Sequence, residues 1–356
     1  MSEITYAEAI ALAMEDAMAQ DTSVVCLGVG VTDPTGIFGT TKTVADRFPK
    51  RVIECPLSEN TLTGACVGMG IGGLKPILVH ARMDFLPLTM EHLINSAAKW
   101  EYMTGHPLTM VVRCIVGRGW GQGPTHSQNL AAMVAHIPGL RVFMPYRPVD
   151  AYYAIRQALG ESQPTIIVES RRLYGTKGQA PNRLGAGGYW GYGHSWSYGP
   201  WTESRLASWP SRYDMQIVGI GDALVEANLA GEAMGANGYS VQVIDCQQYP
   251  LKYQHPLNER WDWLKATKRL VVVDNAPAFC GLSAEIVAMA AESTHRELRV
   301  IRVTPPSTPC PSAAHLEAEW YPSVAKVIAA CQDVLGIPGT IPAMLEPQTM
   351  TVPSPF

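Results

Sequence analysis

The chain has 356 residues, a length that suggests two domains of ordinary size, and 47% of them are apolar. The formal net charge is -4 and no run of Lys or Arg stands out, which excludes the basic footprint of a nucleic-acid-binding protein. No apolar run approaches the ~18 residues of a membrane helix, so no membrane span is expected.

The eight cysteines are scattered singly without a CxxC pair, and several lie in apolar runs, as is typical of reduced, buried thiols. The first residues have neither the basic nor the apolar region of a secretory signal. We therefore expect a cytoplasmic protein.

Up to about residue 178, strand-like and helical segments alternate along the chain. Thr5 and Glu8 form a capping box that predicts a helix running on to Met18. Short apolar runs predict strands at 24–27, 51–53, 76–80, 108–113, 141–144 and 165–169. Small-residue or periodic segments predict helices at 61–73, 88–103, 129–136 and 150–159. The alternation is typical of a doubly wound, mostly parallel α/β domain at 1–178.

The composition changes between residues 179 and 212, where Gly, Trp, Tyr and Ser dominate without a period. We interpret this segment as a linker, although a loop this long and aromatic would also suit the cover of a partner surface or a site. A second, smaller α/β domain is expected at 213–335, and a Pro-rich, extended tail at 336–356. The expected strands of the second domain are 215–220, 240–244, 270–273 and 298–303, and its helices are 224–236, one around 264, 282–291 and 323–335.

Glu59 stands where a strand ends and a small-residue helix begins, the position at which open α/β sheets place ligand sites. Almost all of its neighbours there are uncharged. The local residues leave two interpretations open. The commoner one is a structural carboxylate at a helix N-terminus, and the other is a catalytic acid that keeps a proton near neutral pH.

A second candidate follows the strand expected at 108–113. Glycines at every second position from Gly117 to Gly123 form a loop that can approach a ligand closely. His126 comes next and is a fair acid/base candidate, although a lone histidine is more often structural. Ser127 lacks the turn that surrounds a triad nucleophile, and the other histidines show no metal-ligand spacing. The GxGxxG pattern at 68–73 lies inside a helix, which argues against a dinucleotide-binding dehydrogenase.

One ordered set of short motifs spans residues 3 to 335. It comprises Ile4-Thr5-Tyr6, Pro56-Leu57-Ser58-Glu59, Gly73-Leu74-Lys75-Pro76, Asp84-Phe85, Asn95-x-Ala97-Ala98-Lys99, Gly119 to Gly123, His126-Ser127-Gln128, Leu173-Tyr174-Gly175, Asp245 and Val271-Val272-Val273-Asp274. With these motifs the chain resembles the β subunit of thiamine-diphosphate-dependent 2-oxo acid dehydrogenase E1 components, in the transketolase-like pyrimidine-binding family. The resemblance implies a pyrimidine-binding α/β domain followed by a transketolase C-terminal-type domain.

The resemblance implies a role for three residues. Glu59 matches the carboxylic acid that stands beside N1′ of the cofactor's pyrimidine, and Phe85 matches the residue stacked on that ring. His126 matches the histidine that handles protons or the acyl acceptor. Retention of all three argues against a non-catalytic scaffold subunit.

The family's diphosphate and Mg²⁺ motif, GDG followed by Asn, is missing from this chain. In the family this motif lies on a separate α subunit. The resemblance therefore implies an α2β2 assembly in which a partner α subunit carries Mg²⁺. Many members also bind K⁺ through backbone carbonyls, and Ala158, Leu159, Glu161 and Gln163 line up with that segment.

The expected reaction is cleavage of a 2-oxo acid or ketose and transfer of the acyl or ketol unit to an acceptor. The oxidative E1 reaction with a lipoyl acceptor is favoured. Transketolase-like or carboligating transfer to an aldehyde is the alternative, because some residues depart from the family pattern. Val29-Gly30 stand where Glu-Asp is usual, and Asn275 stands where Glu is usual.

Overall fold

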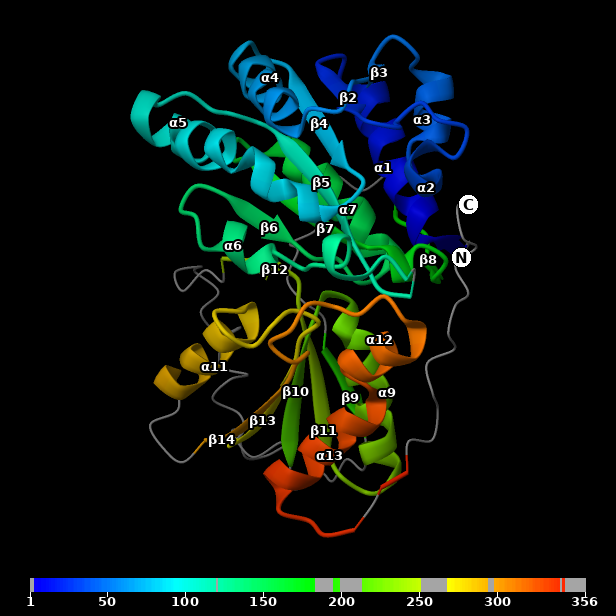
Figure 1. Cartoon of the computed structure of the whole chain (residues 1–356), viewed down its shortest axis with the longest axis vertical. Coiled ribbons are helices and arrows are strands. Elements are labelled where there is room, and N and C mark those ends of the chain that lie inside the picture. Colours follow the sequence, from blue (N-terminus) through cyan, green and yellow to red (C-terminus); the bar gives the residue numbers. More distant parts are fainter. Residues whose placement is uncertain are drawn as a thin grey trace. The chain divides into compact units, whose positions relative to one another are not determined.

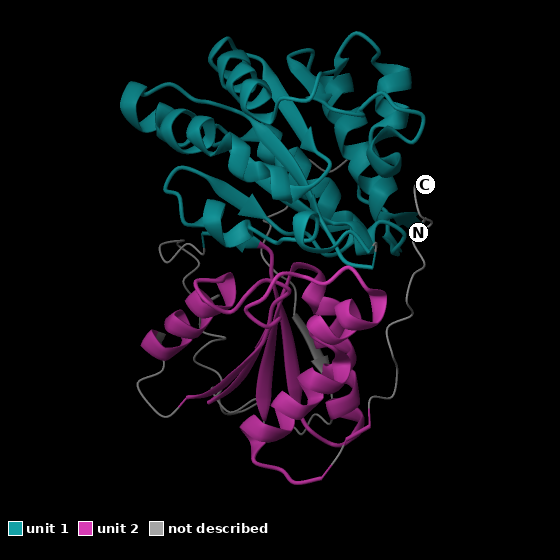
Figure 2. Ribbon diagram, in the orientation of Figure 1, with its two compact units in different colours: residues 1–191, 248–250, 351–356 teal, residues 192–247, 251–350 magenta. Residues whose placement is uncertain are grey.

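The computed structural model describes residues 3–119, 121–182, 195–198, 213–250, 268–293, 298–339 and 341–342. The chain divides into two compact units, coloured separately in Figure 2. Among the described residues, unit 1 holds those up to 182 together with 248–250, and unit 2 holds the rest.

Unit 1 is built on a seven-stranded sheet, labelled in Figure 1, with the order β12-β6-β7-β5-β4-β2-β3. Its strands are β2 (Val24–Gly28), β3 (Val52–Glu54), β4 (Lys75–His80), β5 (Val111–Val116), β6 (Arg141–Phe143), β7 (Thr165–Ser170) and β12 (Gln248–Tyr249). All neighbours pair in parallel except β12, which is antiparallel to β6. The four strands β2, β4, β5 and β7 are almost wholly buried, as expected for apolar runs in a parallel sheet.

The helices of unit 1 follow the strands in alternation, so the expected α/β architecture is confirmed. They are α1 (Tyr6–Gln20), α2 (Gly36–Gly39), α3 (Lys42–Arg47), α4 (Glu59–Ile71), α5 (Ala98–Thr104), α6 (Ala131–Ala135) and α7 (Pro148–Gly160). The short helical turns are η1 (Met83–Thr89), η2 (His92–Ala97), η3 (Gly123–Thr125) and η4 (Arg171–Leu173). The capping box at Thr5 and Glu8 forms as predicted, and α1 packs along α7.

The long helix expected at 88–103 is wrong as a single element. The segment divides into the 3₁₀ turn η1, the π-helix η2 and the α-helix α5. Pro87 lies inside η1, where it cannot donate a backbone hydrogen bond. Around η2, His92 lies so close to α4 that a Cβ on Gly64 would stand 2.9 Å from its ring. Two local constraints therefore break a pattern that reads as one amphipathic helix.

The strand expected at 108–113 lies three residues further on, as β5. The expected strand ended at Arg113, whereas β5 continues past it. In the structure Arg113 and Glu169 are both 0% exposed and form an ion pair, with Nε 2.5 Å and Nη2 2.8 Å from the two carboxylate oxygens. Since the charge is neutralised from the neighbouring strand β7, the apolar run continues to Val116.

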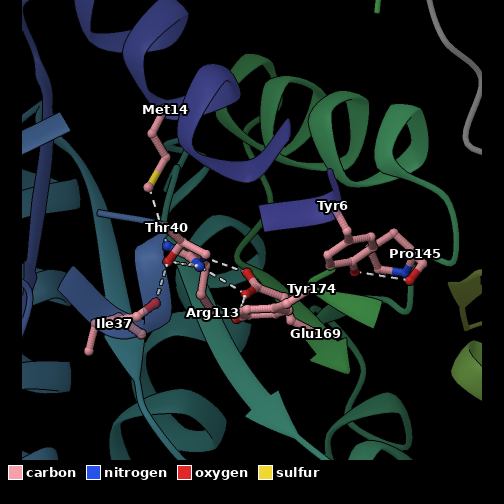
Figure 3. Close-up of polar contacts among 8 residues, drawn as sticks. All are labelled: Tyr6, Met14, Ile37, Thr40, Arg113, Pro145, Glu169 and Tyr174. Carbon is pink, nitrogen blue, oxygen red and sulfur yellow. Dashed lines mark hydrogen bonds and ion pairs between the residues drawn. The ribbon is translucent and has the colours of Figure 1, made fainter. Parts of the chain in front are cut away.

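Figure 3 shows how this ion pair joins segments that are distant in sequence. Arg113 Nη2 also donates to Thr40 Oγ1 at 2.9 Å, and the Tyr174 hydroxyl donates to Glu169 at 2.7 Å. Tyr6, whose ring stacks on that of Tyr174, donates to the carbonyl of Pro145. The network therefore fixes the loop after β2 and the segment after β7 on one face of β5.

The N-terminus and the end of unit 1 pair with each other. β1 (Glu3–Thr5) is antiparallel to β8 (Lys177–Gln179), so the strand β8 spans residue 178, where the end of the first domain was expected.

The helix expected at 129–136 is shorter than predicted, as α6, because Asn129 Oδ1 accepts from the backbone of Ala131.

Unit 2 contains a five-stranded sheet with the order β14-β13-β10-β11-β9. Its strands are β9 (Ser195–Tyr198), β10 (Met215–Ile220), β11 (Val241–Cys246), β13 (Arg269–Val273) and β14 (Arg299–Val303). Its helical elements are η5 (Gly221–Ala223), α9 (Leu224–Ala236), α11 (Leu282–Ser293), α12 (Ala314–Trp320) and α13 (Val324–Leu335). The four strands expected here are confirmed, while the helix expected around residue 264 and most of the Pro-rich tail lie outside the described residues.

Two elements of unit 2 are absent from the expectation. β9 lies within the segment interpreted as a linker and pairs antiparallel with β11 at the edge of the sheet. α12 was missed because its seven residues are too short to show a helical period.

No helix of the described chain is long and apolar enough to cross a membrane.

Candidate active site

The three residues singled out in the sequence follow three strands of the unit 1 sheet. Glu59 comes after β3, Phe85 after β4 and His126 after β5. Because these strands are parallel, their carboxyl ends share one edge of the sheet. The connection from β2 leads to β3 and that from β4 leads to β5, on opposite sides of the β2–β4 pair. This point, where connections diverge, is where open α/β sheets bind ligands.

Glu59 is the first residue of α4 and is half-buried. Ser58 does not cap the helix, since its hydroxyl donates to Thr61 Oγ1 at 2.8 Å. In the described part of the chain, the Glu59 carboxylate has no hydrogen-bond or ion-pair partner. It is therefore free to bond a ligand at a helix end that favours negative charge.

Phe85 and His126 are brought into contact by the fold. Their ring centroids lie 5.7 Å apart with an interplanar angle of 87°, an edge-to-face arrangement. Both side chains are half-buried. His126 Nδ1 lies 2.8 Å from Thr125 Oγ1, so one ring nitrogen is already bonded. The arrangement offers an aromatic surface beside an oriented imidazole.

Glu59 belongs to the same edge without touching this pair. The helix that it begins, α4, packs against η1, the turn that carries Phe85. Among the described residues, the Glu59 carboxylate forms no hydrogen bond or ion pair with His126 and no contact with the ring of Phe85. A ligand that reached all three residues would therefore lie across the ends of β5, β4, β2 and β3.

Two polar braces hold the loop of His126 to the segment after β4. Asp84 Oδ1 accepts from the backbone and the side chain of Gln128, at 3.2 and 2.9 Å. Arg82 Nε donates to Gln122 Oε1 at 2.8 Å. Sequence reasoning gave these residues no role. The available signal was the alternation of Arg82 and Asp84 after a buried strand, which places both on the edge that carries the site.

The loop after β2 is held by a residue that the sequence analysis did not select. The Glu54 carboxylate accepts from the backbone of Gly30 at 2.5 Å and from the backbone and hydroxyl of Thr32, each at 3.0 Å. Burial raises the pKa of Glu54, but the hydrogen bonds from Gly30 and Thr32 outweigh it and leave the pKa below its usual value. The Glu54 carboxylate, held by these hydrogen bonds, thus lies beside Val29 and Gly30, the two residues that depart from the family pattern.

The segment aligned with a K⁺ site ends α7 and leads into β7. Thr109 Oγ1 donates to the carbonyl of Glu161 at 2.8 Å, and Thr165 Oγ1 donates to that of Gln163 at 3.0 Å. Each carbonyl retains a second lone pair.

No group of three or more His, Cys, Asp or Glu side chains suited to a metal ion occurs among the described residues. All eight cysteines are unpaired.

Comparison with known proteins matches both units. Residues 2–177 match the transketolase pyrimidine-binding domain and residues 210–327 match the transketolase C-terminal domain. The chain is 30% identical to the β subunit of acetoin:2,6-dichlorophenolindophenol oxidoreductase from Cupriavidus necator, over 92% of this chain and 96% of that one. It is 31% identical to the β subunit of the pyruvate dehydrogenase E1 component from Rickettsia bellii, over 93% and 98%. The chain belongs to the E1 β-subunit family.

Solved structures agree at the level of the fold. A split-gene transketolase, described as an inactive β4 tetramer, matches with a TM-score of 0.71 and 18% identity, over 94% of this chain and 99% of that one. The transketolase of Leishmania mexicana matches with a TM-score of 0.70 and 18% identity, over 96% and 47%. This E1 β-type chain therefore has the transketolase fold in both units.

Proposed function

We propose that this chain is the pyrimidine-binding subunit of a two-component thiamine diphosphate enzyme that acts on a 2-oxo acid. The observation that carries the proposal is the Phe85–His126 pair at the carboxyl edge of the parallel sheet, with the uncommitted Glu59 carboxylate on the same edge. The names of the E1 and acetoin β subunits that resemble the chain support this choice of reaction.

The residues present fit an aminopyrimidine ring. The half-buried face of Phe85 suits stacking on a flat heterocycle. The carboxyl group of Glu59, which has no partner in the described chain, suits a hydrogen bond to a ring nitrogen. When bound, thiamine diphosphate would supply the carbon nucleophile that attacks the carbonyl of the 2-oxo acid.

Within this scheme, the residues of the chain orient and exchange protons. Glu59 holds a proton at N1′ of the pyrimidine, and Phe85 keeps the ring plane fixed. His126, with Nδ1 bonded to Thr125, presents its other ring nitrogen for proton transfer to or from the reacting groups. The Arg82–Gln122 and Asp84–Gln128 bonds keep that imidazole in place.

A partner chain is part of the proposal, because the GDG…Asn motif is missing from the 356 residues. An α-type subunit would hold the diphosphate and Mg²⁺ in an α2β2 assembly. The acceptor is a lipoyl group in the oxidative reaction that we favour, and an aldehyde in the transketolase-like alternative. We also propose a cytoplasmic location, in keeping with the eight unpaired cysteines.

K⁺ is proposed at the carbonyls of Ala158, Leu159, Glu161 and Gln163. Thr109 and Thr165 already fix two of these carbonyls, which prearranges them for a cation. Potassium chloride should raise the thermal midpoint of the chain above the value in sodium chloride of equal ionic strength. Equal midpoints in the two salts would remove K⁺ from the proposal.

The decisive experiment replaces Glu59 in the complex reconstituted with the α-type chain. Glu59→Gln should abolish turnover of the 2-oxo acid while leaving assembly and thermal stability intact. Glu91→Gln, a change at an exposed carboxylate, is the matched control and should keep full activity. Undiminished turnover in Glu59→Gln would overturn the proposal. Turnover with a free aldehyde and none with lipoamide would instead select the alternative acceptor.

A further inference from the structure

A histidine packs against the helix that begins with Glu59. His92 is the first residue of the π-helix η2, and its ring lies against Gly64 of α4. A Cβ atom on Gly64 would stand 2.9 Å from both Cε1 and Nε2 of the imidazole, closer than the ~3.5–4.0 Å of an ordinary contact. The absence of a side chain at Gly64 therefore lets the ring approach the helix backbone.

The contact is linked to Glu59 through one turn of α4. Thr63 precedes Gly64, is 0% exposed and donates its hydroxyl to the carbonyl of Glu59 at 2.8 Å. Ser58 does not cap the helix, so the bond from Thr63 adds to the few that hold the first residue. A shift of α4 at Gly64 would therefore move Glu59 with it.

The same contact is linked to Phe85 through the segment that carries His92. η2 begins three residues after η1, the turn that contains Phe85, and α4 packs against both η1 and η2. A π-helical turn is rare in proteins and occurs frequently at functional sites. Here it begins with the residue whose ring reaches α4. The close approach thus joins the segment of Glu59 to the segment of Phe85.

The position of the ring depends on the backbone of η2 and on Gly64. Nδ1 of His92 lies 3.2 Å from the carboxylate of Glu91, but the side chain of Glu91 is 63% exposed and that of His92 is 31% exposed. An exposed pair of this kind contributes little. The atoms turned to α4 are Cε1 and Nε2, on the other side of the ring from this pair.

We propose that His92 is a positioning residue, which sets the spacing between Glu59 and Phe85 through its contact with Gly64. Glu59 and Phe85 are the residues proposed to hold the aminopyrimidine. Their spacing decides whether one flat ring can stack on Phe85 and reach the Glu59 carboxyl group at the same time. The inference rests on the proposed function for the identity of the ligand. It adds a residue that acts on the site through helix packing.

The experiment measures the affinity for thiamine diphosphate and the turnover of the 2-oxo acid in the complex reconstituted with the α-type chain. His92→Ala removes the ring, so the affinity should fall about tenfold and the turnover at saturating cofactor about 10–100-fold, as a displacement of about 1 Å can cause. His92→Gln reaches as far as Nε2 without a rigid ring and should fall between. A purely structural loss would lower the folded fraction without changing the affinity of the remainder.

A double substitution connects the effect to the contact. Gly64→Ala alone should lower the affinity, because its Cβ displaces the ring of His92. In the double variant Gly64→Ala/His92→Ala, the methyl group at position 64 enters the space that the ring has left. The loss in the double variant should therefore be smaller than the product of the two single losses, as is typical of residues in contact.

The isolated chain provides a matched control. Gly68 lies one turn further along α4, and a Cβ there would meet no atom within 4 Å. Gly68→Ala should therefore keep or raise the thermal midpoint of the isolated chain, since Ala favours a helix over Gly. Gly64→Ala should lower it, and His92→Ala should relieve that loss. Equal midpoints for Gly64→Ala and Gly68→Ala would contradict the close contact.

Unchanged affinity and turnover in His92→Ala would overturn the positioning role, as would single losses that multiply in full in the double variant. If His92→Ala does not fold, unchanged affinity in His92→Gln would have the same meaning. A complex of the unmodified chain that binds no thiamine diphosphate would refute the proposed function and this inference together. Turnover that is abolished by Glu59→Gln but unaffected by His92→Ala would refute this inference alone.

Discussion

The ring of Phe85 meets the imidazole of His126 edge to face, with centroids 5.7 Å apart. The two residues are 41 positions apart in the sequence and follow adjacent strands, β4 and β5. An edge-to-face pair fixes the plane of both rings. The contact therefore couples the surface proposed to stack on the pyrimidine to the residue proposed to move protons.

Loss of the Phe85 ring should weaken cofactor binding and disturb His126 together. Phe85→Leu keeps an apolar side chain but removes the aromatic face, so the affinity for thiamine diphosphate in the reconstituted complex should fall about tenfold. Phe279→Leu, at a side chain that is 86% exposed in unit 2, is the control and should bind normally. Calorimetric titration measures both, and unchanged affinity in Phe85→Leu would contradict the stacking role.

The hydroxyl of Thr125 should position His126. Thr125→Val keeps the shape but removes the bond to Nδ1, so turnover in the reconstituted complex should fall. Thr125→Ser restores a hydroxyl and should recover the turnover. His126→Asn should lower turnover by about 10²–10⁴-fold. A Thr125→Val variant with undiminished turnover would show that the contact does not position the imidazole.

Breaking the Arg113–Glu169 pair should destabilise unit 1 strongly. Arg113→Gln leaves a carboxylate 0% exposed and without its cation, and such losses cost about 3–5 kcal/mol. Arg47→Gln removes the partly exposed pair with Glu15 and should cost about 0–1 kcal/mol. Urea unfolding of the two variants measures the difference. A cost for Arg113→Gln as small as that for Arg47→Gln would contradict the role of the pair.

His80 should make the stability of unit 1 depend on pH. It is 4% exposed at the end of β4, its Nε2 has no partner in the described chain, and burial lowers its pKa to about 4. Because the unfolded chain binds the proton first, this contribution is present above pH ~6.5 and is lost as the pH falls through about 4. In His80→Leu, the urea midpoint of unfolding should therefore depend less on pH within that window. An unchanged slope would show that another group titrates there.

Asp274 should produce the opposite slope in unit 2. Burial is the main cause that raises its pKa to about 6, against hydrogen bonds from the backbone of Ala276 and Ser283 that lower it. The native state therefore favours the protonated form. Its contribution is present below pH ~4 and is lost as the pH rises through about 6.

Asp274→Asn keeps a neutral side chain of the same shape at every pH. It should remove the loss of stability between about pH 4 and 6, so that the thermal midpoint no longer falls over that range. Asp333→Asn, in the last turn of α13, is the control and should leave the slope in place. A slope that persists unchanged in Asp274→Asn would contradict the prediction.

Most strands were predictable because a parallel sheet buries both faces of each strand and leaves a short apolar run, as at β4 and β10. The errors arise where contacts with other parts of the chain act on a local pattern. The strand β5 continues past Arg113 because the charge of Arg113 is neutralised by a residue 56 positions away. The helix expected at 88–103 was divided because Pro87 and the close approach at Gly64 act on it.

For the candidate site, the sequence by itself determined which chemical groups are present and which strand each one follows. Glu59, Phe85 and His126 were identified from motifs that a chain carries without knowledge of its packing. Only the tertiary structure decided which of them meet. It placed Phe85 on His126, bound Asp84 to Gln128 and set Arg82 and Arg171 on Phe38. Those contacts join different strands and loops, so their geometry depends on strand order and packing, which no local pattern encodes.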